Sequence, residues 1–122
     1  FKSDSESLTE RCPFLADEVN VERIRKAKQI LHTELRNTPS IKDLARRVGM
    51  NETHLKTGFK RIYGCPIYTW VVEQRLALAH EMISNGTHNV NEVADQIGYT
   101  NVSQFISAFK KRYGITPGRL RA

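Results

Sequence analysis

Apolar residues recur every three or four positions along most of this chain, which is the spacing that one face of an α-helix requires. The first stripe consists of Val21, Ile24, Ala27, Leu31 and Leu35. Asn20 is placed to cap this helix, and the turn chemistry of residues 37–39 predicts its end near Arg36. No segment alternates apolar and polar residues as a strand does, so the sequence predicts an all-α fold of about seven helices.

A pair of short helices separated by a tight turn follows the first helix. Ser40 begins the pair in a capping-box pattern, and Gly49 stands where the end of a helix requires a left-handed residue. Asn51 is placed to cap the next helix, and Gly64 closes that helix. The predicted buried faces are Ile41, Leu44, Ala45 and Val48 in the first helix, and Leu55, Phe59 and Ile62 in the second.

The same helix-turn-helix pattern recurs about fifty residues later. Positions from Ile41 to Gly49 match at an offset of 49 and those from Leu55 to Gly64 at an offset of 50, so the second copy holds one extra residue. Its expected caps are Asn89 with Glu92 and Asn101 with Gln104, and its expected core is Val90, Val93, Ala94, Ile97, Phe105, Ala108 and Phe109. The last helix is expected to end at Gly114, because Pro117 prevents its continuation.

These patterns divide the chain into four parts. Residues 1–19 form an acidic tail or interdomain linker, 20–66 a first helix-turn-helix subdomain, 67–85 a long connecting helix and 86–122 a second helix-turn-helix subdomain. The formal charge of +6 is unevenly divided: residues 1–19 hold two basic and five acidic residues, a net −3, which leaves +9 for residues 20–122. A folded part this basic favours a polyanionic partner, although charge alone does not identify one.

Several classes of function lack the residues that they need. A structural zinc site takes four ligands, whereas Cys12 and Cys65 lie 53 residues apart and the four histidines stand singly, so no metal site is expected. No paired carboxylates, nucleophile–base pair or glycine-rich phosphate loop is present, so we expect no catalytic residue, no cofactor and no enzyme. Two cysteines 53 residues apart, with no signal peptide expected, fit the reduced cytoplasm, and no apolar run is long enough to cross a membrane.

The outer face of the second helix in each copy is the candidate reading surface for duplex DNA. A helix braced by a partner across a tight turn fits the major groove, which is about 12 Å wide. The positions opposite the buried stripe are Thr53, Lys56, Thr57 and Lys60 in the first copy, and Ser103, Ile106, Ser107 and Lys110 in the second. Both sets follow i, i+3, i+4, i+7 spacing without an acidic residue, so we expect both to contact bases. The first copy is the stronger candidate because it has two lysines.

The residue types suggest a role for each position. Lys56 can donate to guanine O6 or N7, and the methyl groups of Thr53 and Thr57 can contact a thymine methyl. Ile106 has two possible interpretations, a thymine-methyl contact or a partly covered packing residue. Candidate phosphate contacts, which position a protein without carrying sequence information, are Lys42, Arg46, Arg61 and Lys111.

The segment 93–99, followed by Phe105, residues 109–111, Tyr113-Gly114 and Thr116-Pro117, resembles the C-terminal signature of the AraC/XylS family of arabinose-operon-type regulators. The resemblance covers about residues 21–121 and implies two helix-turn-helix subdomains joined by one long helix. Residues 52–63 and 102–113 would be the recognition helices, entering successive major-groove segments. The resemblance also implies a bacterial transcription regulator, typically an activator that contacts RNA polymerase, with an effector-binding or dimerisation domain preceding residue 1. Residues 55–59 are similar to a branch that regulates siderophore and iron-uptake genes.

The sequence departs from the family pattern at three positions. Thr57 stands where the family often has a large basic residue, and Leu120 where it often has an aromatic residue. Gly58 lies inside the first recognition helix, where it costs roughly 1 kcal/mol of helix propensity relative to alanine and permits close packing or close approach to DNA. These differences concern the base contacts rather than the fold.

Two other functional classes compete with DNA reading. Some DNA-repair methyltransferases carry a similar helical domain, but their chemistry needs a four-cysteine cluster that two cysteines cannot supply. The second alternative is a helical interaction module whose basic faces bind an acidic protein partner. A module made for an acidic protein should bind all duplex sequences alike, whereas a DNA reader should prefer particular sequences. Measuring binding to different duplexes therefore separates the two alternatives.

Overall fold

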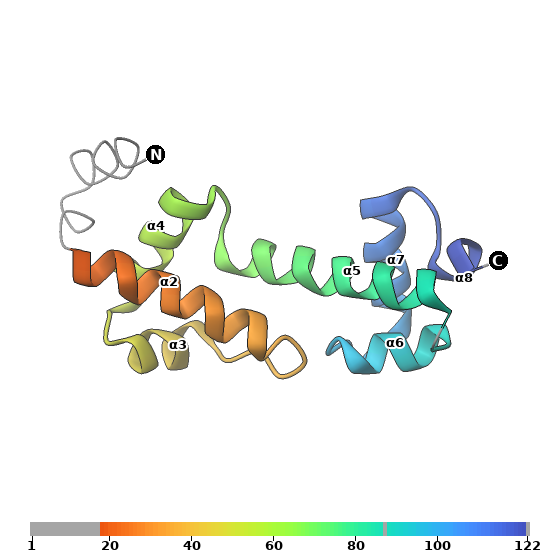
Figure 1. The fold of residues 1–122 in the computed structure, drawn as a ribbon, viewed down its shortest axis with the longest axis horizontal. Helices are drawn as coiled ribbons and strands as arrows, with labels where there is room; N and C mark the ends of the chain where they lie inside the picture. Colours follow the sequence, from red (N-terminus) through yellow and green to blue (C-terminus); the bar gives the residue numbers. More distant parts are fainter. Residues whose placement is uncertain (1–17, 87, 122) are drawn as a thin grey trace. The chain divides into compact units, whose positions relative to one another are not determined.

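The structure, a computed structural model, describes residues 18–86 and 88–121 and contains seven α-helices and no strand within them (Figure 1). In chain order the helices are α2 (Glu18–Thr33), α3 (Ile41–Val48), α4 (Glu52–Tyr63), α5 (Ile67–Asn85), α6 (Val90–Gln96), α7 (Val102–Tyr113) and α8 (Pro117–Arg121). The predicted all-α class is confirmed, with α3–α4 and α6–α7 as the two helix-turn-helix pairs. Apart from Glu18 and Val19, which belong to α2, the predicted tail lies outside the described residues, as does Cys12.

The first helix begins and ends earlier than its sequence pattern predicts. Because α2 starts at Glu18, Asn20 lies inside its first turn, and the prediction that Asn20 caps the helix is wrong. Glu18 places a negative charge at the positive end of the helix dipole, which favours the earlier start. The helix ends at Thr33 rather than near Arg36, and residues after it turn away from the helix axis.

The end of the chain holds one more helix than the pattern around Pro117 suggests. α7 ends at Tyr113 as predicted, but Pro117 then begins α8. Proline suits the first position of a helix because its fixed φ is helical and its missing N–H would have no intrahelical partner there. The Arg119 N–H donates to the Thr116 hydroxyl over 3.3 Å, which helps to start this helix.

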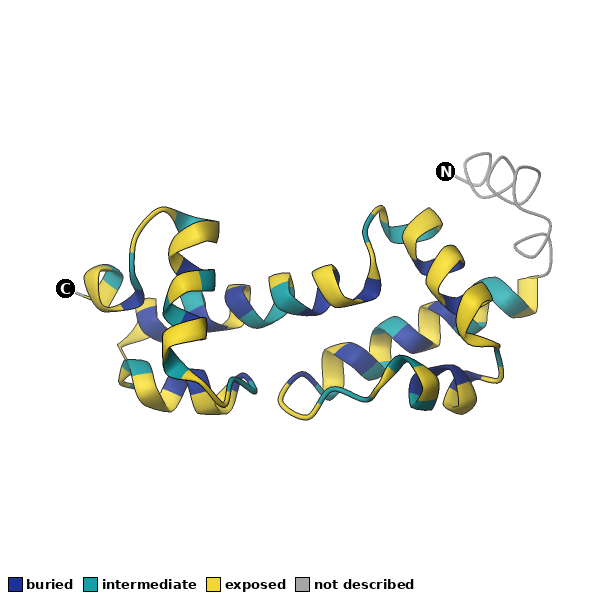
Figure 2. Cartoon of the chain, turned by 180° about the vertical axis from the view of Figure 1, so that it is seen from behind, coloured by how far each residue is buried: buried dark blue, intermediate teal, exposed yellow. Residues whose placement is uncertain are grey.

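The described chain divides into two compact units that differ from simple halves of the sequence. Of the described residues, one unit holds 18–34 together with Pro39–Trp70, and the other holds Leu35–Thr38 together with 71–86 and 88–121. The division therefore falls inside α5. In both units, the helices bury one side and expose the other (Figure 2).

The core of the first unit is formed by the apolar stripes of α2, α3 and α4 with the start of α5. Its buried residues are Ile24, Ala27, Leu31, Leu44, Ala45, Val48, Leu55, Phe59, Ile67 and Trp70. The Phe59 ring meets Trp70 edge-on at 5.9 Å and lies 4.8 Å from the Tyr63 ring. Burying a side chain the size of Phe59 contributes about 1.5–3 kcal/mol, so this core fixes α4 against α2 and α3.

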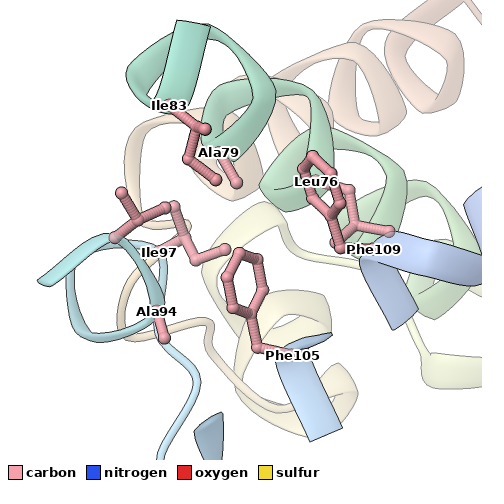
Figure 3. Close-up of a cluster of buried hydrophobic side chains, with 8 residues drawn as sticks. Leu76, Ala79, Ile83, Ala94, Ile97, Phe105 and Phe109 are labelled. Atoms are coloured by element: carbon pink, nitrogen blue, oxygen red, sulfur yellow. The ribbon is translucent and has the colours of Figure 1, made fainter. Parts of the chain in front are cut away.

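The core of the second unit joins α5 to the second helix-turn-helix pair (Figure 3). It consists of Leu76, Ala79, Ile83, Val93, Ala94, Ile97, Phe105 and Phe109. The two phenylalanine rings meet edge-on at 5.8 Å and belong to one cluster with aliphatic side chains of α5 and α6 (Figure 3). The duplicated sequence pattern thus supplies Phe59 and Phe109 as equivalent core residues of α4 and α7.

Arg75 of α5 attaches the segment 35–38 to the second unit. Its Nε donates to the Leu35 carbonyl over 2.9 Å, its Nη2 donates to the Thr38 hydroxyl over 2.8 Å, and its guanidinium lies 5.8 Å from the centre of the Tyr99 ring. Leu35 is only 8% exposed. These contacts explain why four residues that precede α3 in sequence belong to the unit that contains α6 and α7.

Candidate nucleic-acid interface

Local side-chain chemistry fixes the turn between α3 and α4. The Asp43 N–H donates to the Ser40 hydroxyl at the start of α3, and the His54 N–H donates to Asn51 Oδ1 at the start of α4. Between them, Gly49 adopts φ 76°, a left-handed backbone conformation that residues with a side chain rarely adopt. Arg23 of α2 donates from Nη1 to the Gly49 carbonyl over 3.1 Å. The structure confirms Ser40 and Asn51 as N-caps and Gly49 as the turn residue, whereas the Asp43 carboxylate pairs with Arg46 and not with the Ser40 N–H that a capping box requires.

The predicted reading stripe of α4 lies on the solvent side of the first unit. Its four residues, Thr53, Lys56, Thr57 and Lys60, are all exposed, whereas Leu55 and Phe59 are fully buried. Gly58 is also buried, which supports the close-packing interpretation of this glycine. The first unit therefore presents two lysines and two threonines on one helix face.

The second pair repeats this construction with a stronger cap. Asn89 Oδ1 accepts from the Glu92 N–H over 2.8 Å, and Glu92 Oε1 accepts from the Asn89 N–H over 2.9 Å, which makes a complete capping box. Asn101 Oδ1 accepts from the Gln104 N–H at the start of α7. In the turn, Gly98 has φ 97° and lies so close to the backbone of Arg36 that a Cβ would stand 2.5 Å from the Arg36 carbonyl oxygen.

The outer stripe of α7 is less uniform than that of α4. Ser103, Ser107 and Lys110 are exposed, but Ile106 is half-buried and packs against the hydrophobic core of the second unit. The packing interpretation of Ile106 therefore has contacts to support it, while its predicted contact with a thymine methyl stays a prediction. The two stripes share a scaffold and differ in the chemistry that they offer.

The four candidate phosphate contacts are all exposed. Lys42 and Arg46 lie on α3, Arg61 at the end of α4 and Lys111 near the end of α7. Arg46 also donates to Asp43, one turn earlier on the same helix. An exposed pair of this kind contributes little to stability, so it leaves the guanidinium able to exchange partners.

One arginine and one tyrosine of the first unit have roles inside the fold. Arg47 donates through both Nη atoms to the carboxylate of Glu34, over 3.0 and 2.6 Å. The hydrogen bond from Arg47 lowers the pKa of Glu34, and the same bond raises the pKa of Arg47. Burial raises the pKa of Tyr63, whose ring lies 5.0 Å from the Lys28 ammonium. The Arg47 pair therefore links α3 to the residue that follows α2, and the contact of Lys28 with Tyr63 links α2 to the end of α4.

A groove beside α4 contains residues that the sequence pattern did not single out. Its volume is about 760 Å³, and it lies within the first unit. Its lining includes Lys56, Lys60 and Arg61 of α4, Ile41 of α3, and Pro66 and Tyr68 at and just before the start of α5. Tyr68 is 74% exposed, the largest exposed fraction among the large apolar and aromatic side chains of the described residues. The sequence held one signal for this groove, which is the aromatic residue Tyr68 at a solvent-facing position of α5.

Two other kinds of site are absent from the described residues. Within residues 18–86 and 88–121, no three His, Cys, Asp or Glu side chains lie close enough to hold a metal ion together. In the same ranges, no helix combines the length and the apolar character that crossing a membrane requires.

Comparison with known proteins identifies a domain type over most of the chain. A helix-turn-helix domain family matches residues 44–122. The transcriptional regulator ExsA of Pseudomonas aeruginosa is 31% identical over 85 residues, which cover 70% of this chain and 31% of ExsA. The regulatory protein PchR of the same organism is 42% identical over 70 residues, which cover 57% of this chain and 24% of PchR. The chain thus spans between about a quarter and a third of the length of these relatives.

Solved structures share the fold. A transcriptional regulator of Chromobacterium violaceum described as containing an AraC-type DNA-binding domain superposes with a TM-score of 0.76 at 20% identity, over 86% of this chain and 94% of that one. The DNA-binding domain of AdpA, solved in complex with a target DNA, superposes with a TM-score of 0.75 at 20% identity, over 80% of this chain and 88% of the AdpA chain.

Proposed function

Because the chain belongs to the AraC-type family of helix-turn-helix domains found in DNA-binding transcription regulators, we propose that it binds a specific duplex sequence with α4 and α7 as its recognition helices. The observation that carries this proposal is the outer stripe of α4, where Thr53, Lys56, Thr57 and Lys60 are all exposed on a helix braced from behind by α2 and α3. In the same proposal, α7 contributes a second reading face through Ser103, Ser107 and Lys110.

The charge of the stripe supports DNA as the ligand. Lysine donates to guanine O6 and N7, and threonine methyl groups contact thymine, so the stripe of α4 suits the major groove. Within residues 18–86 and 88–121, no carboxylate forms an ion pair with Lys56 or Lys60. We propose that Lys42, Arg46, Arg61 and Lys111 contact phosphates and that the two helices read half-sites about one helical turn, ~10–10.5 bp, apart.

The wider role follows from the family and is also a proposal. The chain acts as the DNA-binding part of a transcription regulator in the bacterial cytoplasm, and regulation by activation involves contact with RNA polymerase. Relatives that are named as activators, such as the virulence regulon transcriptional activator VirF of Yersinia enterocolitica, support activation as the mode. That the chain serves iron-uptake genes stays a prediction from its sequence alone.

Selection of binding sites from a random duplex library tests the proposal. The selected duplexes are expected to contain two half-motifs in fixed spacing, and the 122-residue chain should prefer them to random duplex at physiological salt. Equal binding to all duplexes would refute sequence-specific reading and would favour a basic surface made for an acidic protein.

Lys56→Ala tests the assignment of the reading stripe. We expect a loss of roughly 1–3 kcal/mol on the selected site with relaxed preference at one base pair, because a base contact is removed. Lys26→Ala is the matched control, since it removes the same charge from an exposed position of α2 in the same unit. Lys111→Ala should instead weaken selected and random duplexes alike and lower the salt slope by about one. An equal loss for Lys56→Ala on both duplexes would make Lys56 a phosphate contact.

A further inference from the structure

The groove beside α4 combines two kinds of wall that a simple cationic patch would not have. The wall formed by α4 carries the positive charges of Lys56, Lys60 and Arg61, and none of the three forms an ion pair with a carboxylate among the residues that the structure describes. The wall formed by the start of α5 is apolar, and Tyr68 is its largest and most exposed member. A ligand that fits this groove therefore has an anionic side and an apolar side.

We propose that this groove holds the sugar-phosphate backbone of one DNA strand, with Tyr68 as a positioning residue that contacts it. The proposal rests on the proposed function, because it assumes that α4 enters the major groove. A phosphate then faces Arg61, the deoxyribose packs against the Tyr68 ring, and the Tyr68 hydroxyl donates to a phosphate oxygen. Tyrosine is among the side chains that donate to phosphates in protein–DNA complexes.

Continuity with the reading stripe favours a DNA strand over a separate small ligand. Lys56, Thr57 and Lys60 belong both to the groove and to the stripe. Arg61 lies four residues after Thr57, so it continues the same side of α4 toward the start of α5. A strand that borders the major groove occupied by α4 passes directly beside this row. A small molecule bound here would compete with that strand.

The second unit has no counterpart of Tyr68. The offset of 50 residues that relates α4 to α7 places Gly118 at the equivalent position, in the first turn of α8. Gly118 has no side chain to contact a sugar or a phosphate, and no atom lies within 4 Å of the place where its Cβ would be. Tyr68 therefore gives the first unit a backbone contact that the repeat does not duplicate.

The test compares Tyr68→Ala, Tyr68→Phe and Thr69→Ala on the selected duplex and on random duplex, with fluorescence anisotropy as the readout. Thr69 is the matched control because it is exposed, adjacent on α5 and not part of the groove wall. We expect Tyr68→Ala to weaken binding to both duplexes by the same factor, roughly 10–150-fold, as for the loss of a hydrogen bond to a charged group. Tyr68→Phe keeps the ring and should lose less.

Two further readouts separate a backbone contact from other roles. Tyr68→Ala removes no charge, so the slope of log K against log salt should stay unchanged, whereas Arg61→Ala should lower it by about one. In hydroxyl-radical footprinting, Tyr68→Ala should lose protection of the deoxyriboses at one edge of the first half-site. Because Tyr68 is 74% exposed, its removal should leave the melting temperature unchanged.

The outcomes distinguish this proposal from the one on which it rests. If the unmodified chain selects no sequence, the proposed function fails whatever Tyr68 does. If it selects a site but Tyr68→Ala binds both duplexes as tightly as Thr69→Ala does, only the role of Tyr68 fails. A loss confined to the selected sequence would make Tyr68 a base-reading residue and would also overturn the proposal.

Discussion

Replacing Gly98 by alanine tests how the segment 35–38 is attached to the second unit. Gly98 has φ 97°, and a Cβ at this position would stand 2.5 Å from the carbonyl oxygen of Arg36 and 3.1 Å from its carbonyl carbon. The obstructing atoms belong to the backbone, so no side-chain rotation relieves the contact. Either the turn between α6 and α7 or the segment 35–38 must shift.

The expected cost has two parts, and a second glycine separates them. Placing alanine in a left-handed conformation costs about 1–2 kcal/mol, and forcing an extra carbon into a packed site costs a further ~1–3 kcal/mol. Gly114→Ala in the same unit is the matched control, because Gly114 has φ 80° but no atom within 4 Å of its Cβ position. The loss of conformational freedom in the unfolded chain is the same for both changes and cancels in the comparison.

Urea unfolding followed by circular dichroism measures the difference between the two variants. With a slope of about 1–3 kcal/mol per molar urea, an additional loss of ~1–3 kcal/mol for Gly98→Ala lowers the midpoint by about 1 M relative to Gly114→Ala. Losses that agree within about 0.5 kcal/mol would show that the Arg36 carbonyl does not press on the turn, and the close packing of the Arg36 backbone against Gly98 would be wrong.

Three further predictions concern single contacts. Ile106→Ala should lower the free energy of unfolding by ~2 kcal/mol with unchanged base preference if packing is its role, and a changed preference at a thymine in the selected site would instead support base contact. Asn89→Ala should cost about 1 kcal/mol in urea unfolding, because the N–H of Glu92 loses its acceptor; an unchanged midpoint would contradict the capping box. The lowered pKa of Glu34 means that its bond to Arg47 stabilises the fold above the ordinary Glu range and is lost as pH falls through the folded-state pKa. The melting temperature should therefore fall more on acidification in the unmodified chain than in Glu34→Gln, and parallel curves would contradict this coupling.

Local chemistry made most of the fold predictable from the sequence. Ser40, Asn51, Asn89 and Asn101 precede their helices with the side chains that accept the first free N–H groups, and the structure uses all four as caps. The glycines that end helices could also be predicted from the sequence, because a helix end often requires a positive φ, which favours glycine. The same reasoning wrongly predicted Asn20 as a cap, because α2 already begins two residues earlier at Glu18.

The features that the sequence could not predict depend on residues far apart in the chain. Nothing near Arg36 indicates that it will lie against Gly98, or that Arg75 will hold Leu35 and Thr38. The groove beside α4 likewise needs α3, α4 and α5 in place before its walls exist. The outer stripes, by contrast, follow from helical periodicity alone, and only the coverage of Ile106 required the packed core.

The attachment of residues 35–38 has a consequence for how such a repeat can be inherited. A gene fragment that starts at the second copy would encode α6, α7 and α8 but not Leu35, which is 8% exposed, nor the backbone that rests on Gly98. The second copy would lack a piece that is encoded before the first. Once a duplicated helix-turn-helix acquires this dependence, its second copy cannot be moved into another gene without losing a packed segment. Selection then favours inheritance of the second copy together with the residues before the first, while mutations in the outer stripes remain free to change what each half reads.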